Sequence, residues 1–352
     1  MTPQHARWTI AARPALVGLA VVSAIIGAFA VVRAAENVWA ADAERNLAAA
    51  LALANGTFGS VEDYLYSPLA AALTMPALAV PTDVAVFAWL VLELSVLVVG
   101  TAVATRGREQ ADRLLAGVAV ICFLPIIYDL ELGNVTVIVL AAVAVAAWMP
   151  DRIATGIPLG LVLATAPKPQ LIPVLIWLAL VHRRALAGAV GTAALATLAG
   201  LAFAGPAAYA AWLDALRAPR YLRGDQVINL ALWSLSPPLA LGGAVAAVGA
   251  FVLALRRGYW PGLIAGICVG LLMAPYTLIY AAGLLLVGVP AAARAAPRAV
   301  LALAVTAPVA LVVAFPAWVG AVLFLAVLAP ADRWRAGPTR PSRGRPKRHG
   351  QP

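Results

Sequence analysis

The chain has 352 residues, of which 63% are hydrophobic and 11% are charged, and its formal net charge is +10. Soluble domains carry roughly 25% charged residues, and a soluble fold of this length exposes too much surface to hide so many apolar side chains. The composition excludes an ordinary water-soluble protein and indicates a membrane protein. The apolar runs lack the period-two alternation of barrel strands, so we predict an all-α, polytopic membrane fold.

The first predicted element is an apolar run at 15–32, which follows Arg7 and Arg13. It resembles a signal peptide, but it is long and has no clear cleavage site, so we interpret it as a retained anchor. A long outer segment at about 33–81 follows. Within it, ADAERNLAAALALANG at 41–56 predicts a helix that lies on the membrane and ends at Asn55-Gly56.

The rest of the chain alternates between apolar runs and short charged or Pro/Gly-rich breaks. A second outer loop is expected at about 205–237. We predict about 10–13 transmembrane helices in a single domain over 1–332, although several runs fall short of the ~20 residues that a perpendicular helix needs. After the first run, the predicted spans are 82–105, 114–127, 135–149, 153–166, 169–181, 185–204, 237–255, 260–273, 276–292, 299–314 and 316–330.

The distribution of basic residues predicts the orientation. With both termini in the cytoplasm, 19 of the 25 Lys and Arg residues fall on the inner side. This asymmetry follows the positive-inside rule. The tail at 333–352 is strongly basic, and beside a membrane it is expected to contact anionic headgroups rather than nucleic acid. We therefore predict a multi-pass cell-membrane protein whose functional face is the outer one.

Polar side chains gather on that outer face, and Lys168 is the most unusual of them. The chain uses arginine 23 times and lysine twice, and Lys168 lies in APKPQLIP between two apolar runs. A compact ammonium at the membrane edge suits a phosphate or pyrophosphate headgroup. The alternative is a hairpin lysine whose amine reaches water.

Asp42 follows the first predicted span, in WAADAERN. A carboxylate just above the bilayer can take the proton from a sugar hydroxyl as that hydroxyl attacks an anomeric carbon. It can equally be a solvated acid on an amphipathic helix. Glu36 and Glu44 are rival candidates that position alone does not exclude.

Arg220 and Arg223 lie in the second outer loop and are candidates to clamp a phosphate, or else they face lipid headgroups. The chain contains no Walker loop, G-x-S-x-G or H-E-x-x-H motif. Its three histidines are dispersed on the predicted inner side. We therefore expect neither a metal nor another cofactor.

Several short elements together resemble glycosyltransferase family 87, a group of integral-membrane enzymes with the GT-C fold that use polyprenyl-phosphate sugars. The chain departs from the family pattern at Asn134, Thr136 and Ala274, where the family has glutamine, asparagine and serine. The matching elements are Asp42 to Gly56, Tyr66-Ser67-Pro68-Leu69, Gly133 to Thr136, Lys168 to Pro173, Asp225 to Asn229, and Ala274 to Leu278.

The resemblance implies that Asp42 is the general base and that Lys168, with Arg220 or Arg223, holds the donor phosphate. It implies an inverting transfer of mannose or an arabinose-like sugar from a polyprenyl-phosphate donor to an envelope glycolipid or glycan. A low-basicity phosphate leaving group needs electrostatic stabilisation rather than a metal. The residues expected to bind substrate are Tyr66, Asn134, Gln170, Asn229 and Tyr276.

A secondary transporter or a flippase of lipid-linked sugars is the alternative, because transporters also have many membrane spans with both termini in the cytoplasm. Transporters place their determining polar residues near the bilayer midplane. Here the predicted spans are nearly free of charged residues, with Glu93 the acid deepest within one, while the outer edge is rich in polar groups. The distribution favours an outward-facing enzyme.

Overall fold

The structure is a computed structural model that describes residues 41–329 apart from 62–63, 107–109, 111–112, 114–115, 118–119, 121–122, 218–230, 233–234 and 276. Within these residues the chain is helical and has no strand, which confirms the predicted all-α class. The predicted first span at 15–32, Glu36 and the basic tail lie outside the described residues, as do 114–115, 118–119 and 121–122 of the span predicted at 114–127.

The described residues at 41–79 form a small helical unit. The helix predicted at 41–56 is present as α2, Ala41–Ala54, and the chain turns at Gly56, whose φ is 71°. The unit continues through η1, Phe58–Ser60, α3, Pro68–Thr74, and η2, Met75–Ala79. Its small core contains Phe58 and Tyr64, whose rings meet edge to face, and it takes in Ala208 from a distant helix.

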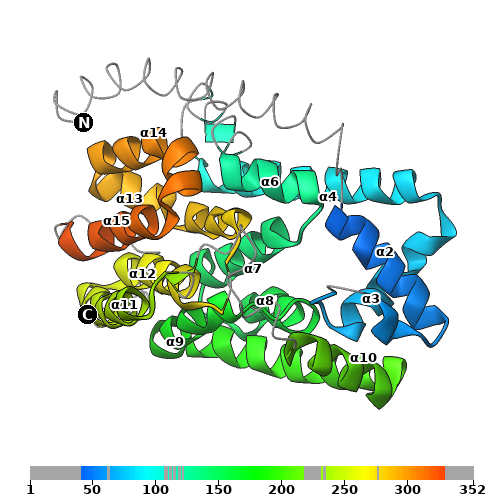
Figure 1. The fold of residues 1–352 in the computed structure, drawn as a ribbon. Coiled ribbons are helices and arrows are strands. Elements are labelled where there is room, and N and C mark those ends of the chain that lie inside the picture. Colours follow the sequence, from blue (N-terminus) through cyan, green and yellow to red (C-terminus); the bar gives the residue numbers. More distant parts are fainter. Residues whose placement is uncertain are drawn as a thin grey trace, which may run out of the picture.

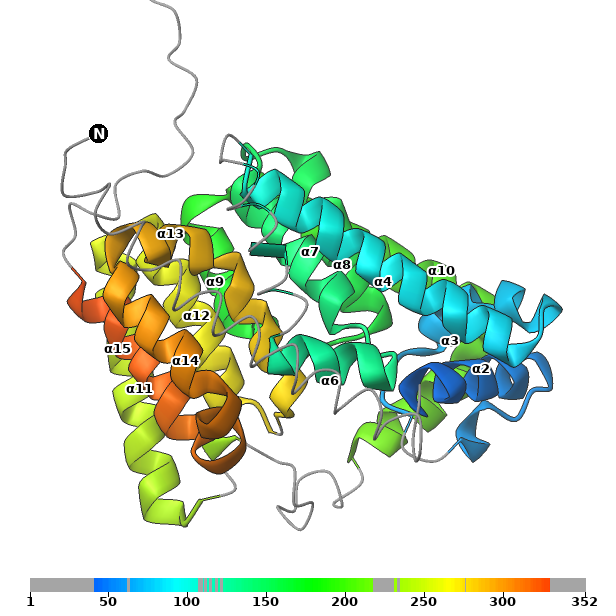
Figure 2. The same cartoon turned by 90° about the horizontal axis from the view of Figure 1, so that it is seen from above.

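The remaining helices form the bundle, and Figures 1 and 2 show the segments after 237 on one side, α4 and α10 on the other, and α7 and α8 between them. The bundle begins with α4, Thr82–Ala104, α6, Leu124–Leu132, α7, Thr136–Trp148, α8, Ile153–Thr165, η3, Pro169–Leu171, α9, Ile172–Val181, and α10, Arg183–Arg217. It continues with α11, Pro237–Arg257, α12, Tyr259–Met273, η6, Ile279–Val287, α13, Val289–Ala295, α14, Pro297–Val313, and α15, Phe315–Leu328.

Two predicted segments differ in part from the structure. The span expected at 185–204 lies within α10, whose helical geometry is interrupted at Gly205, with a φ of 79°, and a second helical stretch then runs on to Arg217, where a loop was expected. Pro206 permits this because proline is tolerated in the first turn of a helix that restarts. The span expected at 276–292 is divided at Gly288 into the 3-10 helix η6 and the short helix α13.

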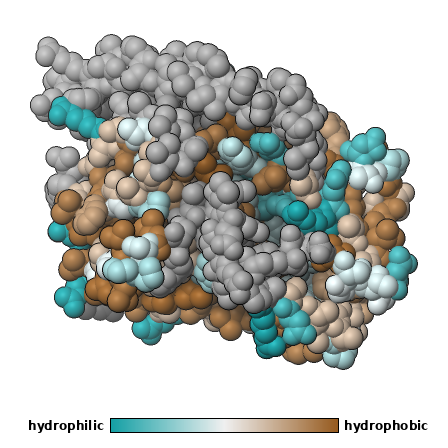
Figure 3. All heavy atoms as spheres, viewed as in Figure 1, coloured by the Kyte–Doolittle hydropathy of each residue, from teal (hydrophilic) through white to brown (hydrophobic). Residues whose placement is uncertain are grey.

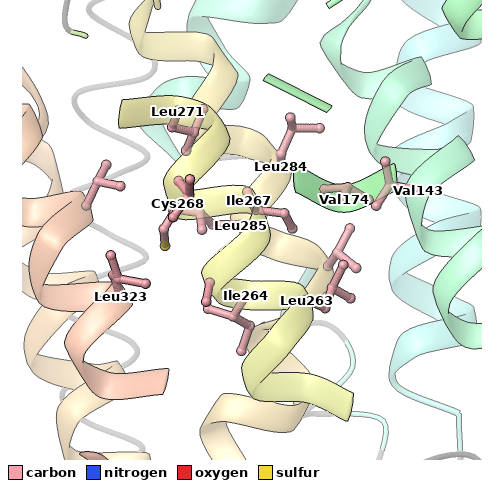
Figure 4. Packing of buried hydrophobic residues seen from close by; sticks show 14 of the residues in the cluster. Val143, Val174, Leu263, Ile264, Ile267, Cys268, Leu271, Leu284, Leu285 and Leu323 are labelled. Carbon is pink, nitrogen blue, oxygen red and sulfur yellow. The ribbon is translucent and has the colours of Figure 1, made fainter. Parts of the chain in front are cut away.

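Helix α12 occupies the centre of the main core. Every residue from Trp260 to Leu272 is buried. Figure 4 shows Leu263, Ile267 and Leu271 on α12 among side chains from neighbouring helices. A helix that is apolar all round is stable only when it is surrounded by other helices or lipid. The sequence YWPGLIAGICVGLLM therefore belongs in the interior of the bundle.

The outer surface of the bundle is apolar, as a lipid-facing surface must be. Three helices in the described part of the chain, α4, α10 and α11, are long and apolar enough to cross a membrane. They expose large side chains such as Phe87, Leu195 and Val245, and Figure 3 shows extensive hydrophobic surface. Exposed apolar area on this scale is unusual for soluble proteins. The protein is therefore a polytopic membrane protein.

Small residues allow α8 and α10 to touch along their backbones. A Cβ added at Gly156 would lie 1.8 Å from the Ala185 carbonyl oxygen, and one at Gly188 would lie 2.0 Å from that of Ile153. Gly156 and Gly160 are four residues apart, a spacing that brings membrane helices into close contact. This contact fixes where α8 ends, and α8 leads directly to Lys168.

The two ends of the bundle differ in charge. Helix α7 begins beside Asn134 and ends at Trp148, roughly 20 Å away at 1.5 Å per residue. At the far end, Asp151 accepts hydrogen bonds from the backbone N–H groups of Arg184 and Ala185, at 2.9 and 3.0 Å, and so caps α10. The exposed arginines at that end are Arg152, Arg183, Arg184, Arg256 and Arg257.

Candidate active site

Asp42 lies in the first turn of α2, and both of its carboxylate oxygens are engaged. Arg45 donates to Oδ1 at 2.9 Å, and the Asn134 side-chain amide donates to Oδ2 at 2.6 Å. The Asp42 side chain keeps 17% of its surface exposed. Each carboxylate oxygen has two lone pairs, so Asp42 retains capacity to accept a proton from a bound hydroxyl. In Figure 3 hydrophilic residues gather where α2 begins, beside a hollow in the surface.

Asn134 joins Asp42 to Lys168. The Asn134 side chain is buried, and its Oδ1 accepts hydrogen bonds from the Thr136 hydroxyl at 3.2 Å and from the Lys168 ammonium at 3.4 Å. These two donors fix the orientation of the amide, so its N–H₂ group points to Asp42. The structure thus brings together a carboxylate, an amide and an ammonium from three segments of the chain.

Gly133 makes this contact possible. It ends α6 with a φ of 63°, in the left-handed region that favours glycine. A Cβ at Gly133 would lie 2.8 Å from the Cβ of Ala43, the residue after Asp42. The close approach of the two backbones places α2 against the end of α6 and sets Asn134 within reach of Asp42.

Lys168 lies in the connection between α8 and η3, outside the long spanning helices. Its ammonium is 5.4 Å from the centre of the Tyr280 ring, close enough for a cation–π interaction. Burial lowers the pKa of Lys168, and the carboxylates of Asp129 and Asp42 oppose that shift. The two acids favour the charged form of this amine, the form that attracts a phosphate.

The element after Lys168 is pressed against the central helix. A Cβ at Gly270 of α12 would lie 1.9 Å from the carbonyl oxygen of Gln170. Gln170 itself is buried. The backbone of η3 is therefore seated on α12, which fixes the direction in which Lys168 leaves α8.

Tyr66 and its neighbours attach the small helical unit at 41–79 to the bundle. Ser67 donates through its hydroxyl to the Ala164 carbonyl at 2.6 Å and through its N–H to that of Thr165 at 2.8 Å. Pro68 then begins α3. The Tyr-Ser-Pro-Leu element thus anchors α3 to the end of α8, while Tyr66 lines a cavity. The other predicted site residues, Arg220, Arg223, Asn229 and Tyr276, lie outside the described residues.

Asp42, Asn134 and Lys168, with Asp129 and Thr136 beside them, form what we call the polar cluster. A cavity of about 230 Å³ lies next to it. Ala43 and Asn46 of α2, Val135 and Ala166 take part in its lining, so it borders both the Asp42 and the Asn134 segments. Most of the other lining residues are apolar and come from α3, α4, α7 and α8. Within the described residues, no three His, Cys, Asp or Glu side chains lie close enough to hold a metal ion.

The model of glycosyltransferase family 87 matches residues 64–244, which is just over half of the chain. The chain belongs to this family. It is therefore a membrane glycosyltransferase, and membership decides against the transporter that the sequence left open. No curated protein and no solved structure matches the chain.

The family match covers only part of the cluster in this glycosyltransferase. Tyr66, Asn134, Lys168 and Gln170 lie inside the matched residues, whereas Asp42 precedes them. The connection of Asp42 to the family-matched residues therefore depends on its contact with Asn134, which is 92 residues away in the chain.

Sequence reasoning missed two residues of this glycosyltransferase's cluster. Asp129 was one polar residue among many on the predicted outer face, and Thr136 was a departure from the family pattern. Asp129 is fully buried and accepts hydrogen bonds from the N–H groups of Thr136 and Val137 at 3.2 and 2.8 Å. An acid shortly before a glycine and the start of an apolar helix was the available signal.

Proposed function

We propose that this family 87 glycosyltransferase transfers a sugar from a polyprenyl-phosphate donor to an envelope glycolipid or glycan on the outer face of the cell membrane. The single observation that carries the proposal is the Asp42–Asn134–Lys168 contact, with its hydrogen bonds of 2.6 and 3.4 Å. The Asn134 side-chain amide holds Asp42, the candidate general base, close to Lys168, the candidate phosphate-binding residue.

In the proposed reaction, the Asp42 carboxylate takes the proton of an acceptor hydroxyl. The hydroxyl oxygen bonds to C1 of the donor sugar while the bond from C1 to the phosphate oxygen breaks. The lipid phosphate leaves with the bonding electrons, and Lys168 stabilises its charge. A single displacement of this kind inverts the configuration at C1. Arg220 and Arg223 remain candidates for a further phosphate contact.

The surroundings of the cluster support a lipid-borne substrate. The adjacent cavity is lined mainly by apolar residues, and the bundle exposes apolar surface close by. A polyprenyl chain travels in the bilayer and delivers its phosphate at the membrane edge, where Lys168 is expected to lie. The opposite end of the bundle is rich in arginine and is expected to face the cytoplasm, which supports the proposal of an outer-face site. Mannose and an arabinose-like pentose are the sugars we propose.

A donor comparison tests the proposal. The purified protein in lipid nanodiscs would be incubated with an envelope lipid extract and either labelled polyprenyl-phosphate mannose or arabinose, or the corresponding nucleotide sugars. We expect transfer only from a polyprenyl-phosphate sugar. Lys168→Ala is expected to raise the donor KM about tenfold or more, because hydrogen bonds to charged groups contribute about 1.5–3 kcal/mol. Transfer from nucleotide sugars alone would exclude the proposed donor.

A further inference from the structure

A second acid of the polar cluster, Asp129, is fully buried. Asp129 lies in the last turn of α6, and none of its surface is exposed. Its two carboxylate oxygens accept the N–H groups of Thr136 and Val137, the first two residues of α7. A carboxylate at the N-terminus of a helix is favourable because it satisfies free N–H groups and complements the helix dipole.

The residues that Asp129 fixes are those that orient Asn134. Thr136 donates its hydroxyl to the Asn134 side-chain oxygen at 3.2 Å, and the Asn134 N–H bonds to the Asp129 backbone carbonyl at 3.0 Å. We call the turn at 134–136 the Asn134–Thr136 corner. Asp129 contacts this corner through both its side chain and its backbone. A shift of this corner would move the amide that joins Asp42 to Lys168.

Asp129 also acts on the charge of Lys168. Burial raises the pKa of Asp129 to about 7, and the Lys168 ammonium and the two N–H groups oppose that rise. The same pair favours the charged form of Lys168. The other titratable groups near the pair are Asp42, which also favours the charged lysine, and the buried Glu93 of α4, an acid like Asp129.

We propose that Asp129 is a positioning residue of the transferase: it holds the Asn134–Thr136 corner in place and is the buried counter-charge of Lys168, which would bind the donor phosphate. The role in donor binding rests on the proposed function, whereas the action on Lys168 does not. An uncharged cap would suffice to begin α7, and a buried carboxylate beside another acid is costly unless its charge is used.

The lysine content of the chain makes a direct test possible, because Lys168 and Lys347 are the two lysines. Acylation of each amine by a soluble amine reagent would be followed against pH by peptide mass spectrometry, with Lys347 as the internal reference. In Asp129→Asn, the midpoint of Lys168 acylation is expected to fall by about one pH unit, the usual effect of losing a nearby opposite charge. The Lys347 midpoint should not change.

Glu131→Gln is the matched control, since it removes one acid from the same helix and should leave the Lys168 midpoint in place. An unchanged midpoint in Asp129→Asn would overturn the proposal. If that variant does not fold, Asp129→Ser carries the same test, because its hydroxyl oxygen still accepts one N–H. Asp129→Glu keeps the charge, and a full shift in that variant would also overturn the proposal.

The kinetics of sugar transfer provide a second test of the role of Asp129. Asp129→Asn should move the alkaline fall of kcat/KM for the donor to lower pH by the same amount as the acylation midpoint. A purely structural role would lower the activity at every pH without moving this fall, and that result would contradict the proposal. If the parent protein transfers no sugar from polyprenyl phosphate, the proposed donor fails, while the acylation midpoint still decides the role of Asp129.

Discussion

At the scale of single residues, the site combines charges that would be unfavourable separately. Asp129 is fully buried, Asp42 is largely covered, and Lys168 interacts electrostatically with both. Burying an unpaired charge costs several kcal/mol, so each of these groups depends on the others. The Asn134 amide, which contacts both Asp42 and Lys168, keeps the two groups together without neutralising either.

The charge of Lys168 predicts a pH dependence. Its pKa is lowered below the ordinary lysine value of 10.5, and only the protonated form binds an anionic donor. We therefore expect kcat/KM for the donor to fall as pH rises, with a midpoint below 10.5.

Lys168→Arg should move this fall to higher pH, because a guanidinium keeps its charge throughout the accessible range. The measurement is kcat/KM against pH for the two proteins at constant ionic strength. The same alkaline midpoint in both would show that another group titrates.

At the scale of elements, the site is formed where backbones approach closely. The contact between Gly133 and Ala43 positions α2, and that between Gly270 and Gln170 positions η3. Glycine is needed at these points because any side chain would occupy the space of the neighbouring backbone or Cβ. The geometry of Asp42 and Lys168 is thus set by residues without functional groups.

Gly133→Ala is expected to lower both stability and transfer. Its φ of 63° alone costs an alanine roughly 1–2 kcal/mol, and the new Cβ would lie 2.8 Å from that of Ala43. Thermal unfolding and the transfer rate measure the two effects. Gly191→Ala is the control, because a Cβ there meets nothing within 4 Å in helix α10. Equal behaviour of the two variants would show that the α2–α6 contact does not position the site.

Most elements could be predicted from the sequence, and the exceptions have physical causes. The apolar runs and their breaks predicted α4, α7, α8, α9 and α11 within a few residues, because apolar composition and charged turns are local signals. Gly205-Pro206 interrupts the helix as such a pair usually does, and a new helical stretch forms beyond it, where Ala208 packs into the small core with Phe58 and Tyr64. Tertiary contacts of this kind are not encoded in local spacing.

The site was only partly predictable for the same reason. Asp42, Asn134 and Lys168 were singled out by residue type and by family resemblance, and the structure brings them together. The contact between Asp42 and Asn134 spans 92 residues, so no spacing rule reveals it. The burial of Asp129 depends on helices from distant parts of the chain, and the sequence alone placed it on a polar face.

At the scale of the whole molecule, the polar cluster and the exposed arginines occupy opposite ends of the bundle. The helices between them expose apolar surface along their length. In the function we propose, the lipid-borne donor reaches the enzyme at the membrane surface beside the polar cluster, and the basic residues at the other end set the orientation.

This arrangement predicts which surfaces are accessible from each side of the membrane. In a variant without Cys122 and Cys268, a membrane-impermeant maleimide should label Asn55→Cys in intact cells. It should label Arg183→Cys only after the membrane is opened, and both native residues are exposed in the structure. The reverse pattern would place the Asp42 cluster on the cytoplasmic side.

The central claim is that Asp42 takes the proton of the acceptor hydroxyl while Lys168 holds the donor phosphate. The most direct measurement is the single-turnover rate of sugar transfer from labelled polyprenyl-phosphate donor by the parent protein and by Asp42→Asn. We predict that the variant folds, binds the donor normally and transfers at least about 100-fold more slowly, the usual contribution of a general base. An unchanged transfer rate in Asp42→Asn would contradict this account.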